Sequence, residues 1–289
     1  MEQYMTVTLT PLMSKRLIAR GIAAMPAVKR AFSEGKIIIS AGSTTAYLYA
    51  ELMGSLPERE IACGIIAEKG FCIGKGMTDY LSAQGRAKYW FFQKGEIIPS
   101  DDLIADLAGF SDDDIFIKGA NAIDARGYAG ILLGNPNSGG LVGQAIGQIM
   151  AQGITFIVPA GLEKMVQGSI VENARRMGIA KLRESAGMPV GLLPVSGQVF
   201  TEIDAFRVLT GADASHCASG GVAGAEGSVA LLLSGTDEQL AEAGNIYRSI
   251  VEKGQRDTIN IQPSQCAEHK WASCITKNMF YRSNVKRGL

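Results

Sequence analysis

Several polar side chains follow directly after a short apolar stretch in the middle of the chain. The stretch 115–117 is Ile-Phe-Ile, and Lys118, Gly119, Asn121 and Asp124 come next. Buried strands of parallel sheets are apolar runs, and in open α/β folds ligands bind just beyond the carboxyl ends of such strands. A carboxylate beside a lysine can act as a general base or bind a sugar hydroxyl. We therefore predict Asp124 as the catalytic residue and the other three as ligand contacts.

A structural interpretation of the same residues stays open. The run from Asp124 to Gly127 is also typical of a polar turn between two strands. Asn121 would then only cap a loop, and none of these side chains would need to touch a ligand.

A second candidate site is the run Gly42, Ser43, Thr44 and Thr45, where a predicted strand turns into a predicted helix. The N–H groups and the dipole at the start of a helix favour anions, and the hydroxyl groups add hydrogen-bond donors. The run lacks the Gly-Lys-Ser/Thr ending of a Walker A loop. We predict that it binds a phosphate or carboxylate, with an ordinary helix cap as the alternative.

Two further loops complete the set of predicted contacts. Gly139 and Gly140 close a loop before a predicted helix, where backbone N–H groups can meet a ligand. Glu163 and Lys164 follow the predicted strand 154–158 and so approach the same edge of the sheet. A lysine there suits a phosphate or carboxylate. The alternatives are a plain connecting loop and a solvated charge pair.

The composition narrows the class of protein. Of 289 residues, 47% are apolar and 19% charged, so a large core is available. Lys plus Arg equals Asp plus Glu at 28 each, which argues against a nucleic-acid partner. We predict no membrane span, no signal peptide and no cofactor, and the five cysteines favour a reducing cytoplasm over disulfide scaffolding.

Apolar patterning predicts alternating strands and helices. The helical segment 14–33 contains Pro26, which should break it. We predict strands at 36–40, 60–66, 71–73, 89–92, 115–117, 130–133, 154–158 and 228–233. We predict helices at 46–53, 100–107, 141–152, 169–177, 199–209 and 236–252. In the helix 199–209, Glu202 and Asp204 should lie on the polar side.

These elements predict an α/β fold, an open, mostly parallel sheet flanked by helices, with an appended small α+β subdomain. The pattern changes after Pro194. We therefore divide the chain into a first domain at 1–195, the subdomain at 196–255 and a C-terminal extension at 256–289.

Soft metal ligands form a weaker candidate site. His216 and Cys217 lie in the predicted subdomain, and Cys266, His269 and Cys274 in the extension. Thiolate and imidazole groups bind zinc, but these spacings fit no standard zinc motif. We therefore predict no metal site.

Three segments together carry a resemblance to a known superfamily. They are Lys36 to Thr45 (KIIISAGSTT), Asp114 to Asp124 (DIFIKGANAID) and Thr155 to Lys164 (TFIVPAGLEK). Their order resembles the NagB/RpiA/CoA-transferase-like (ISOCOT) superfamily, closest in pattern to DeoR-type sugar-sensing domains and sugar-phosphate isomerases. The likeness spans roughly residues 14 to 180.

The resemblance implies a function as well as a fold. In that superfamily the Gly-Ser-Thr-Thr turn holds a sugar phosphate, and Lys164 falls where the repressor domains carry a lysine. Asn121 stands where isomerases often have an aspartate, and an amide cannot act as a base.

We expect a protein that binds a small anion, either a sugar phosphate or a carboxylate. Its chemistry would be of isomerase or transferase type. The alternative is a non-catalytic metabolite sensor or an oligomeric assembly protein, and a homo-oligomer fits either function.

Overall fold

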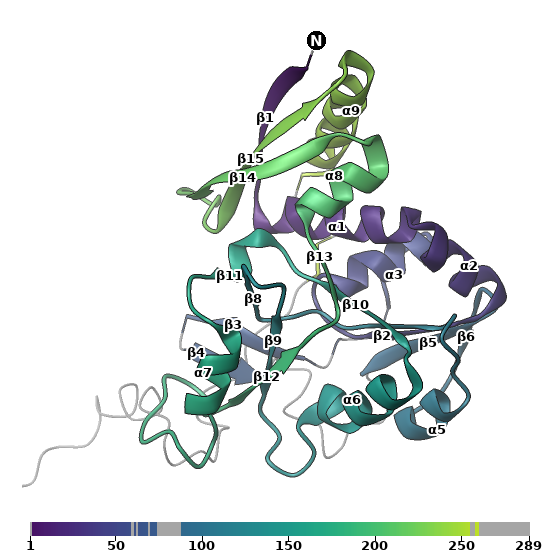
Figure 1. Ribbon diagram of the computed structural model, residues 1–289, viewed down its shortest axis with the longest axis vertical. Helices are drawn as coiled ribbons and strands as arrows, with labels where there is room; N and C mark the ends of the chain where they lie inside the picture. The colour runs from purple at the N-terminus through teal and green to yellow at the C-terminus, as the bar shows by residue number, and fades with distance from the viewer. Residues whose placement is uncertain are drawn as a thin grey trace, which may run out of the picture.

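The chain forms a mixed α/β structure with several sheets (Figure 1). The computed structural model describes residues 2–58, 61, 63–68, 70–73, 88–254 and 258–259. Within these residues no helix is both long and apolar enough to cross a membrane.

The largest sheet has six strands in the order β13-β10-β7-β2-β5-β6. Its four parallel strands are β2 (Lys36–Ser40), β7 (Ile115–Ile117), β10 (Thr155–Pro159) and β13 (Gln198–Phe200). The other two, β5 (Tyr89–Gln93) and β6 (Glu96–Ile98), continue the sheet in antiparallel pairing. The sheet is therefore mixed.

Helices cover both faces of this sheet, which explains its apolar sequence. Figure 1 shows α1 (Pro11–Ala24), α2 (Pro26–Glu34) and α3 (Thr45–Met53) on one face. On the other face are α5 (Leu103–Ala108) and α6 (Gly140–Gln152). Strands covered on both sides must be apolar throughout. Accordingly, every residue of β7 is buried, and the ring of Phe116 packs edge-on against Phe156 at 5.5 Å between centroids.

A second group of strands follows β7 and β10 in the chain. The order is β11-β8-β9-β12, formed by β11 (Met165–Val166), β8 (Ala122–Asp124), β9 (Ala129–Leu133) and β12 (Gly191–Val195). The 3-10 helix η1 (Leu162–Lys164) leads into β11, and α7 (Ile170–Arg176) follows it. A two-stranded ribbon is made by β3 (Gly64–Ala67) and β4 (Gly70–Ile73).

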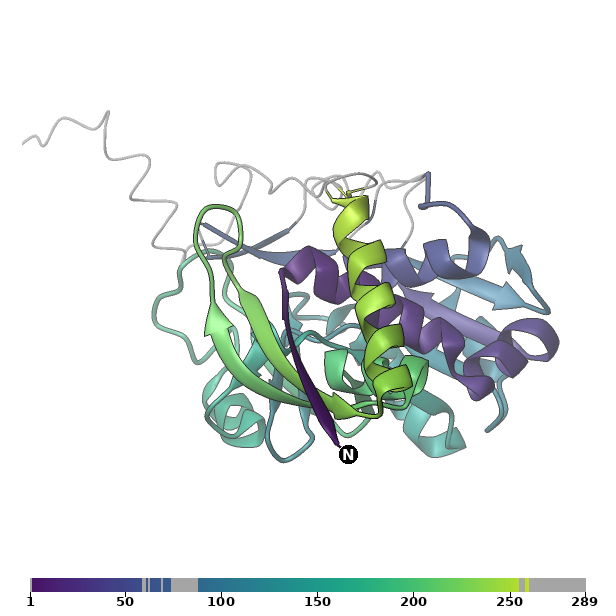
Figure 2. The ribbon, with the colours of Figure 1, turned by 90° about the horizontal axis from the view of Figure 1, so that it is seen from above.

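The third sheet joins the two ends of the described chain. Its order is β1-β15-β14, with β1 (Gln3–Leu9), β15 (Ser228–Gly235) and β14 (Asp213–Gly220) all antiparallel. Seen from above, β1, the β14–β15 hairpin and α9 (Asp237–Lys253) lie together over α1 (Figure 2). Helix α8 (Glu202–Thr210) packs on α1 so closely that a Cβ at Gly21 would lie 2.8 Å from the Cα of Ala205.

Most segments with a clear helical or strand-like spacing of apolar residues form the element predicted for them. The helical segment 14–33 does break at Pro26, which sits at the first position of α2. The predicted helix 236–252 is α9, and a capping box of Thr236 and Gln239 opens it.

The prediction of one helix at 199–209 is wrong at its start, because residues 198–200 pair with β10 as β13. Strands β1 and β14 were not predicted. The residues of β14 are largely exposed and polar or small, so they carry no apolar signal. Strand β1 does carry a signal, the alternation of Met5, Val7 and Leu9, which the prediction missed. Residues 1–195 were assigned to one domain, yet β1 lies in the sheet with β15.

Candidate functional site

The carboxyl ends of the parallel strands meet at one edge of the six-stranded sheet. Ile39 of β2 is level with Ile117 of β7, which is in turn level with Ile157 of β10. The residues that follow these strands must therefore lie near one another. They include Ser43 after β2, Lys118 after β7 and Lys164 after β10.

Lys118 continues the end of the central strand β7. Its backbone N–H donates to the carbonyl of Ile157 at 3.1 Å. Its Nζ lies 3.5 Å from the Gly119 carbonyl, longer than a good hydrogen bond. Burial lowers the pKa of Lys118, Cys63 acts to raise it, and the nearby ammonium of Lys164 lowers it. The residue keeps some exposed surface, but its charged end is surrounded by protein.

Lys164 ends the short helix η1. Its N–H donates to the carbonyl of Gly161 at 3.0 Å, which closes the turn after β10. Burial lowers the pKa of Lys164, whereas Glu163 and Glu202 act to raise it. Lys164 therefore has carboxylates in its surroundings that Lys118 lacks.

Lys15 of α1 is a third lysine at this edge, and it was not predicted. Burial lowers the pKa of Lys15, Lys164 lowers it further, and Glu163 and Cys63 act in the opposite direction. No sequence signal marks Lys15, because it is one of several charged residues within a predicted helix. Only the packing of α1 over the strand ends brings it here.

Within the described part of the chain, none of these three lysines has a direct ion-pair partner. Among the described residues, Lys15, Lys118 and Lys164 form no salt bridge within 4.0 Å. We call them the lysine cluster. Burial also raises the pKa of the Cys63 thiol, whereas Lys118 and Lys15 act to lower that pKa. The thiol therefore stays protonated at neutral pH and supplies no negative charge.

Glu163 carries a carboxylate oxygen without a hydrogen bond. Its Oε2 is buried and has no partner within the described part of the chain. The carboxylate lies against Gly161, where a Cβ would come within 1.9 Å of Oε2. Glycine is thus required for this side-chain position. A buried acceptor without a donor is costly and is a natural contact for a ligand hydroxyl.

Glu202 lies beneath the cluster, not on a polar helix face. It is 0% exposed, so the prediction of an exposed side chain is wrong. Its two oxygens accept from the N–H of Leu162 at 3.2 and 2.9 Å. Burial raises the pKa of Glu202 to about 7, opposed by a hydrogen bond from Ser14 and reinforced by Glu163. Glu202 thereby ties η1 and α1 to the start of α8.

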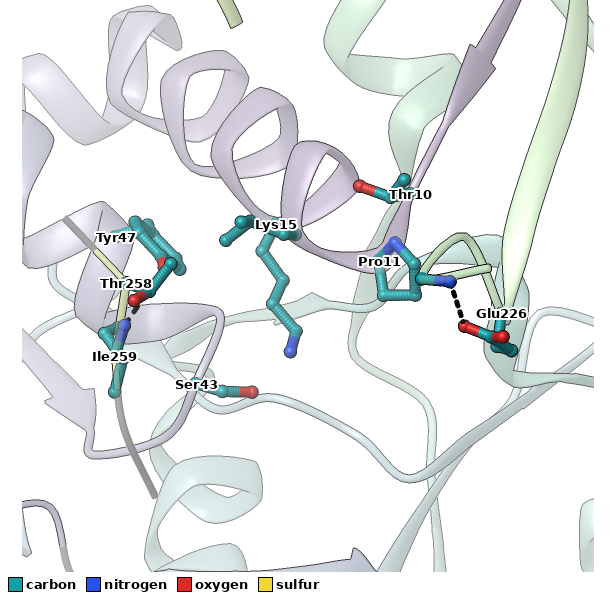
Figure 3. A pocket seen from close by; sticks show the side chains of 10 residues that line it. Thr10, Pro11, Lys15, Ser43, Tyr47, Glu226, Thr258 and Ile259 are labelled. Carbon is teal, nitrogen blue, oxygen red and sulfur yellow. Dashed lines mark hydrogen bonds between the residues drawn. The ribbon is translucent and has the colours of Figure 1, made fainter. Parts of the chain in front are cut away.

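The Gly-Ser-Thr-Thr turn lies next to Lys15 of the lysine cluster. The hydroxyl of Thr45 donates to the carbonyls of Ser40 at 2.6 Å and Gly42 at 3.2 Å, so it holds the turn together. Thr44 is buried. Ser43 and Lys15 line a pocket of about 360 Å³, and Figure 3 shows Lys15 reaching from α1 toward Ser43. Of the four turn residues, only Ser43 lines this pocket.

Asp124 makes a different set of contacts from those expected of a base. Its Oδ1 accepts from the N–H groups of Arg126 at 3.0 Å and Tyr128 at 3.1 Å, and its Oδ2 from Ile170 at 3.0 Å. Burial acts to raise the pKa of Asp124, but these backbone hydrogen bonds and Arg126 hold it below its usual value. This geometry is that of a carboxylate that closes the β8–β9 turn. Its catalytic role stays a prediction.

Three other predicted contacts lie outside the cluster or bond to the backbone. Asn121 accepts from the N–H of Leu132 at 3.0 Å and so joins the loop to β9. Gly139 and Gly140 open α6 with left-handed φ angles of 67° and 70°. Their loop is held by its own Asn135 and Ser138, and α6 covers the face opposite α1 (Figure 1).

Two of the metal-ligating candidates, His216 and Cys217, lie in the described part of the chain. No group of three or more His, Cys, Asp or Glu side chains suited to a metal occurs in the described residues. His216 contacts Ser219 at 2.8 Å, and Cys217 donates to the carbonyl of Ala230. Cys266, His269 and Cys274 lie outside the described residues.

Comparisons with known proteins add no relative. No protein-family model, no curated protein and no solved structure matches the chain. The geometry of the lysine cluster is therefore the basis for a functional proposal.

Proposed function

We propose that the protein binds a small metabolite with a phosphate or carboxylate group at the lysine cluster. The observation that carries this proposal is the convergence of Lys15, Lys118 and Lys164 without a salt bridge in the described chain. Each side chain comes from a different element, so the cluster is a product of the fold and not of local sequence.

The cost of burying positive charge supports this proposal. An ammonium group taken out of water destabilises the fold unless it is paired or loses its proton. An anionic ligand would supply the missing negative charge and would gain a charge-assisted hydrogen bond from each ammonium it reaches. Ser43 and the start of α3 add donors and a favourable dipole beside Lys15.

A pocket of about 360 Å³ lies at one side of the cluster, and its lining includes Lys15 and Ser43 but neither Lys118 nor Lys164. This volume is at the low end of ligand pockets, which suits a compact metabolite. The unpartnered Glu163 Oε2 favours a ligand that also carries a hydroxyl.

The finer description of the fold belongs to the same proposal. The resemblance to the ISOCOT superfamily implies an open sheet that binds sugar phosphates at this edge, with an appended α+β subdomain. The parallel order β13-β10-β7-β2 is consistent with such a sheet.

Isomerase-type or transferase-type activity and non-catalytic sensing remain the two alternatives for this binding site. They differ in one measurable respect, because only an enzyme converts a bound sugar phosphate into product.

Thermal unfolding with added ligand tests the proposal. Inorganic phosphate and dihydroxyacetone phosphate should raise the melting temperature of the wild-type protein, with a gain of about 2.7 kcal/mol at 100 times Kd. The variant Lys164→Gln should lose most of this gain. The control Lys29→Gln removes an exposed lysine of α2 and should keep it.

Two outcomes would count against the proposal. Absence of any stabilisation of the wild type by either compound would remove the anion site. Equal stabilisation of the wild type and Lys164→Gln would place binding elsewhere. Proton NMR of dihydroxyacetone phosphate incubated with the protein then separates enzyme from sensor, since a sensor leaves the spectrum unchanged.

A further inference from the structure

The tip of the β14–β15 hairpin reaches the pocket beside Lys15. Gly224 and Glu226 of this tip line the pocket together with Lys15 and Ser43 (Figure 3). These residues come from three separate parts of the chain, the start of α1, the turn before α3 and the hairpin. One pocket therefore has both an ammonium group and a carboxylate in its lining.

The two charges do not pair with each other. Within the residues that the structure describes, no salt bridge of 4.0 Å or less includes Lys15 or Glu226. In the same part of the chain, no hydrogen bond uses the Lys15 Nζ, the Ser43 hydroxyl or the Oε1 of Glu226. A few polar groups that converge on a cavity in this way can fix the orientation of a small ligand.

Glu226 is held in place by the hairpin itself. Its Oε2 accepts from the N–H of Gly224 at 3.0 Å. The N–H of Ala225 donates to the carbonyl of Val222 at 3.2 Å, and the hydroxyl of Ser228 donates to the carbonyl of Ala225 at 2.5 Å. One carboxylate oxygen is therefore bound within the tip, and the other is left for a ligand.

The rest of the lining suits an aliphatic spacer. It includes the apolar side chains of Pro11, Leu12 and Ile259. Methylene groups of a ligand are favoured against such side chains, because both leave water on contact. A volume of about 360 Å³ limits this spacer to a short one.

We propose that this pocket binds a short zwitterion, with a phosphate or carboxylate at Lys15 and Ser43 and a primary ammonium group at Glu226. The inference rests on the proposed function, which supplies the anionic end. It adds the charge of the other end and assigns Glu226 as the residue that recognises it. A ligand with only the anionic group would leave its far end beside a carboxylate that nothing neutralises.

Isothermal titration calorimetry with matched pairs of compounds tests the inference. Phosphorylethanolamine and n-propyl phosphate differ only in an ammonium group against a methyl group, as do γ-aminobutyrate and n-pentanoate. At an exposed carboxylate such as Glu226, the ammonium compound should bind about two- to fivefold more tightly than its methyl partner, because water screens the ion pair. The pair that binds identifies the anionic end as a phosphate or a carboxylate.

Three variants complete the experiment. Glu226→Gln removes the charge and keeps an oxygen that can accept from Gly224, so the preference for the ammonium compound should disappear while the methyl compound still binds. Glu226→Asp keeps the charge on a shorter side chain and should retain part of the preference. The control Glu96→Gln removes an exposed carboxylate of β6 that does not line the pocket, and it should keep the whole preference.

The possible failures are distinguishable. Equal affinity within each pair would overturn the inference and leave the anion site standing. A preference that persists unchanged in Glu226→Gln would place the ammonium group away from Glu226 and overturn the assignment. If that variant does not fold, the wild-type affinities within each pair still decide the question.

The proposed function has its own separate readout. If inorganic phosphate stabilises the wild type but none of the four compounds binds, the zwitterion is excluded and the proposed function stands. If neither inorganic phosphate nor dihydroxyacetone phosphate stabilises the wild type, the proposed function fails and this inference fails with it.

Discussion

Glu202→Gln should change how the stability of the protein depends on pH. The native carboxyl group has a pKa of about 7 against an ordinary value of 4.5. Between these two values the native state holds a proton that the unfolded state has lost, so the stability of the wild type should fall as the pH rises. A tenfold change in proton affinity corresponds to about 1.4 kcal/mol, and the total is therefore about 3 kcal/mol.

Glutamine keeps the shape of the protonated acid and never loses a proton. Its amide oxygen can accept from the N–H of Leu162 in the way that Glu202 does now. The variant and the wild type should therefore be about equally stable near pH 4.5. By pH 8 the variant should be the more stable by up to about 3 kcal/mol. Loss of attraction to Lys164 reduces this gain, so the figure is an upper bound.

Urea denaturation followed by circular dichroism at several pH values between 4.5 and 8 measures this difference. The control Glu96→Gln removes an exposed carboxylate of β6 and should follow the wild-type curve. Parallel curves for the wild type and Glu202→Gln would refute the reasoning, because they would mean that Glu202 does not bind its proton more tightly in the folded state.

Two further substitutions test the packing around the site. Gly21→Ala should cost about 1–3 kcal/mol, because its Cβ would lie 2.8 Å from the Ala205 backbone and force α1 away from α8. An alanine variant with an unchanged urea midpoint would contradict this close approach. Asp124→Asn should cost about 1–3 kcal/mol, because one of its oxygens becomes a donor facing backbone N–H groups. Thermal unfolding checks this, and unchanged stability would show that the turn does not depend on the carboxylate.

The strand ends of the site were predictable, because apolar strands followed by polar residues carry a clear signal. That signal was enough to select Lys118, Lys164 and the Gly-Ser-Thr-Thr turn as neighbours at one edge. It relies only on parallel pairing, which the apolar runs of β2, β7 and β10 already indicate.

Contacts that arise from tertiary packing were not predictable. Lys15 faces the strand ends because α1 packs over them, and Glu202 is buried because α8 starts beneath η1. The local spacing of apolar and polar residues indicates neither of these two positions. For Asp124 the sequence suggested too much. An aspartate after a strand suggests catalysis, but the hydrogen-bond partners of this carboxylate are backbone N–H groups. Residue type alone does not separate these two uses of a carboxylate.

The pairing of β1 with β15 has a consequence for synthesis. Val7 pairs with Leu231, so the first strand of the chain completes its sheet only after almost the whole described chain has left the ribosome. Helix α1 begins two residues after β1 ends, and it carries Lys15. Helix α1 packs both on α3, which is made early, and on α8, so its full set of contacts is complete only after residues 202–210 have been made. We therefore expect the proposed anion site to be complete only late in synthesis.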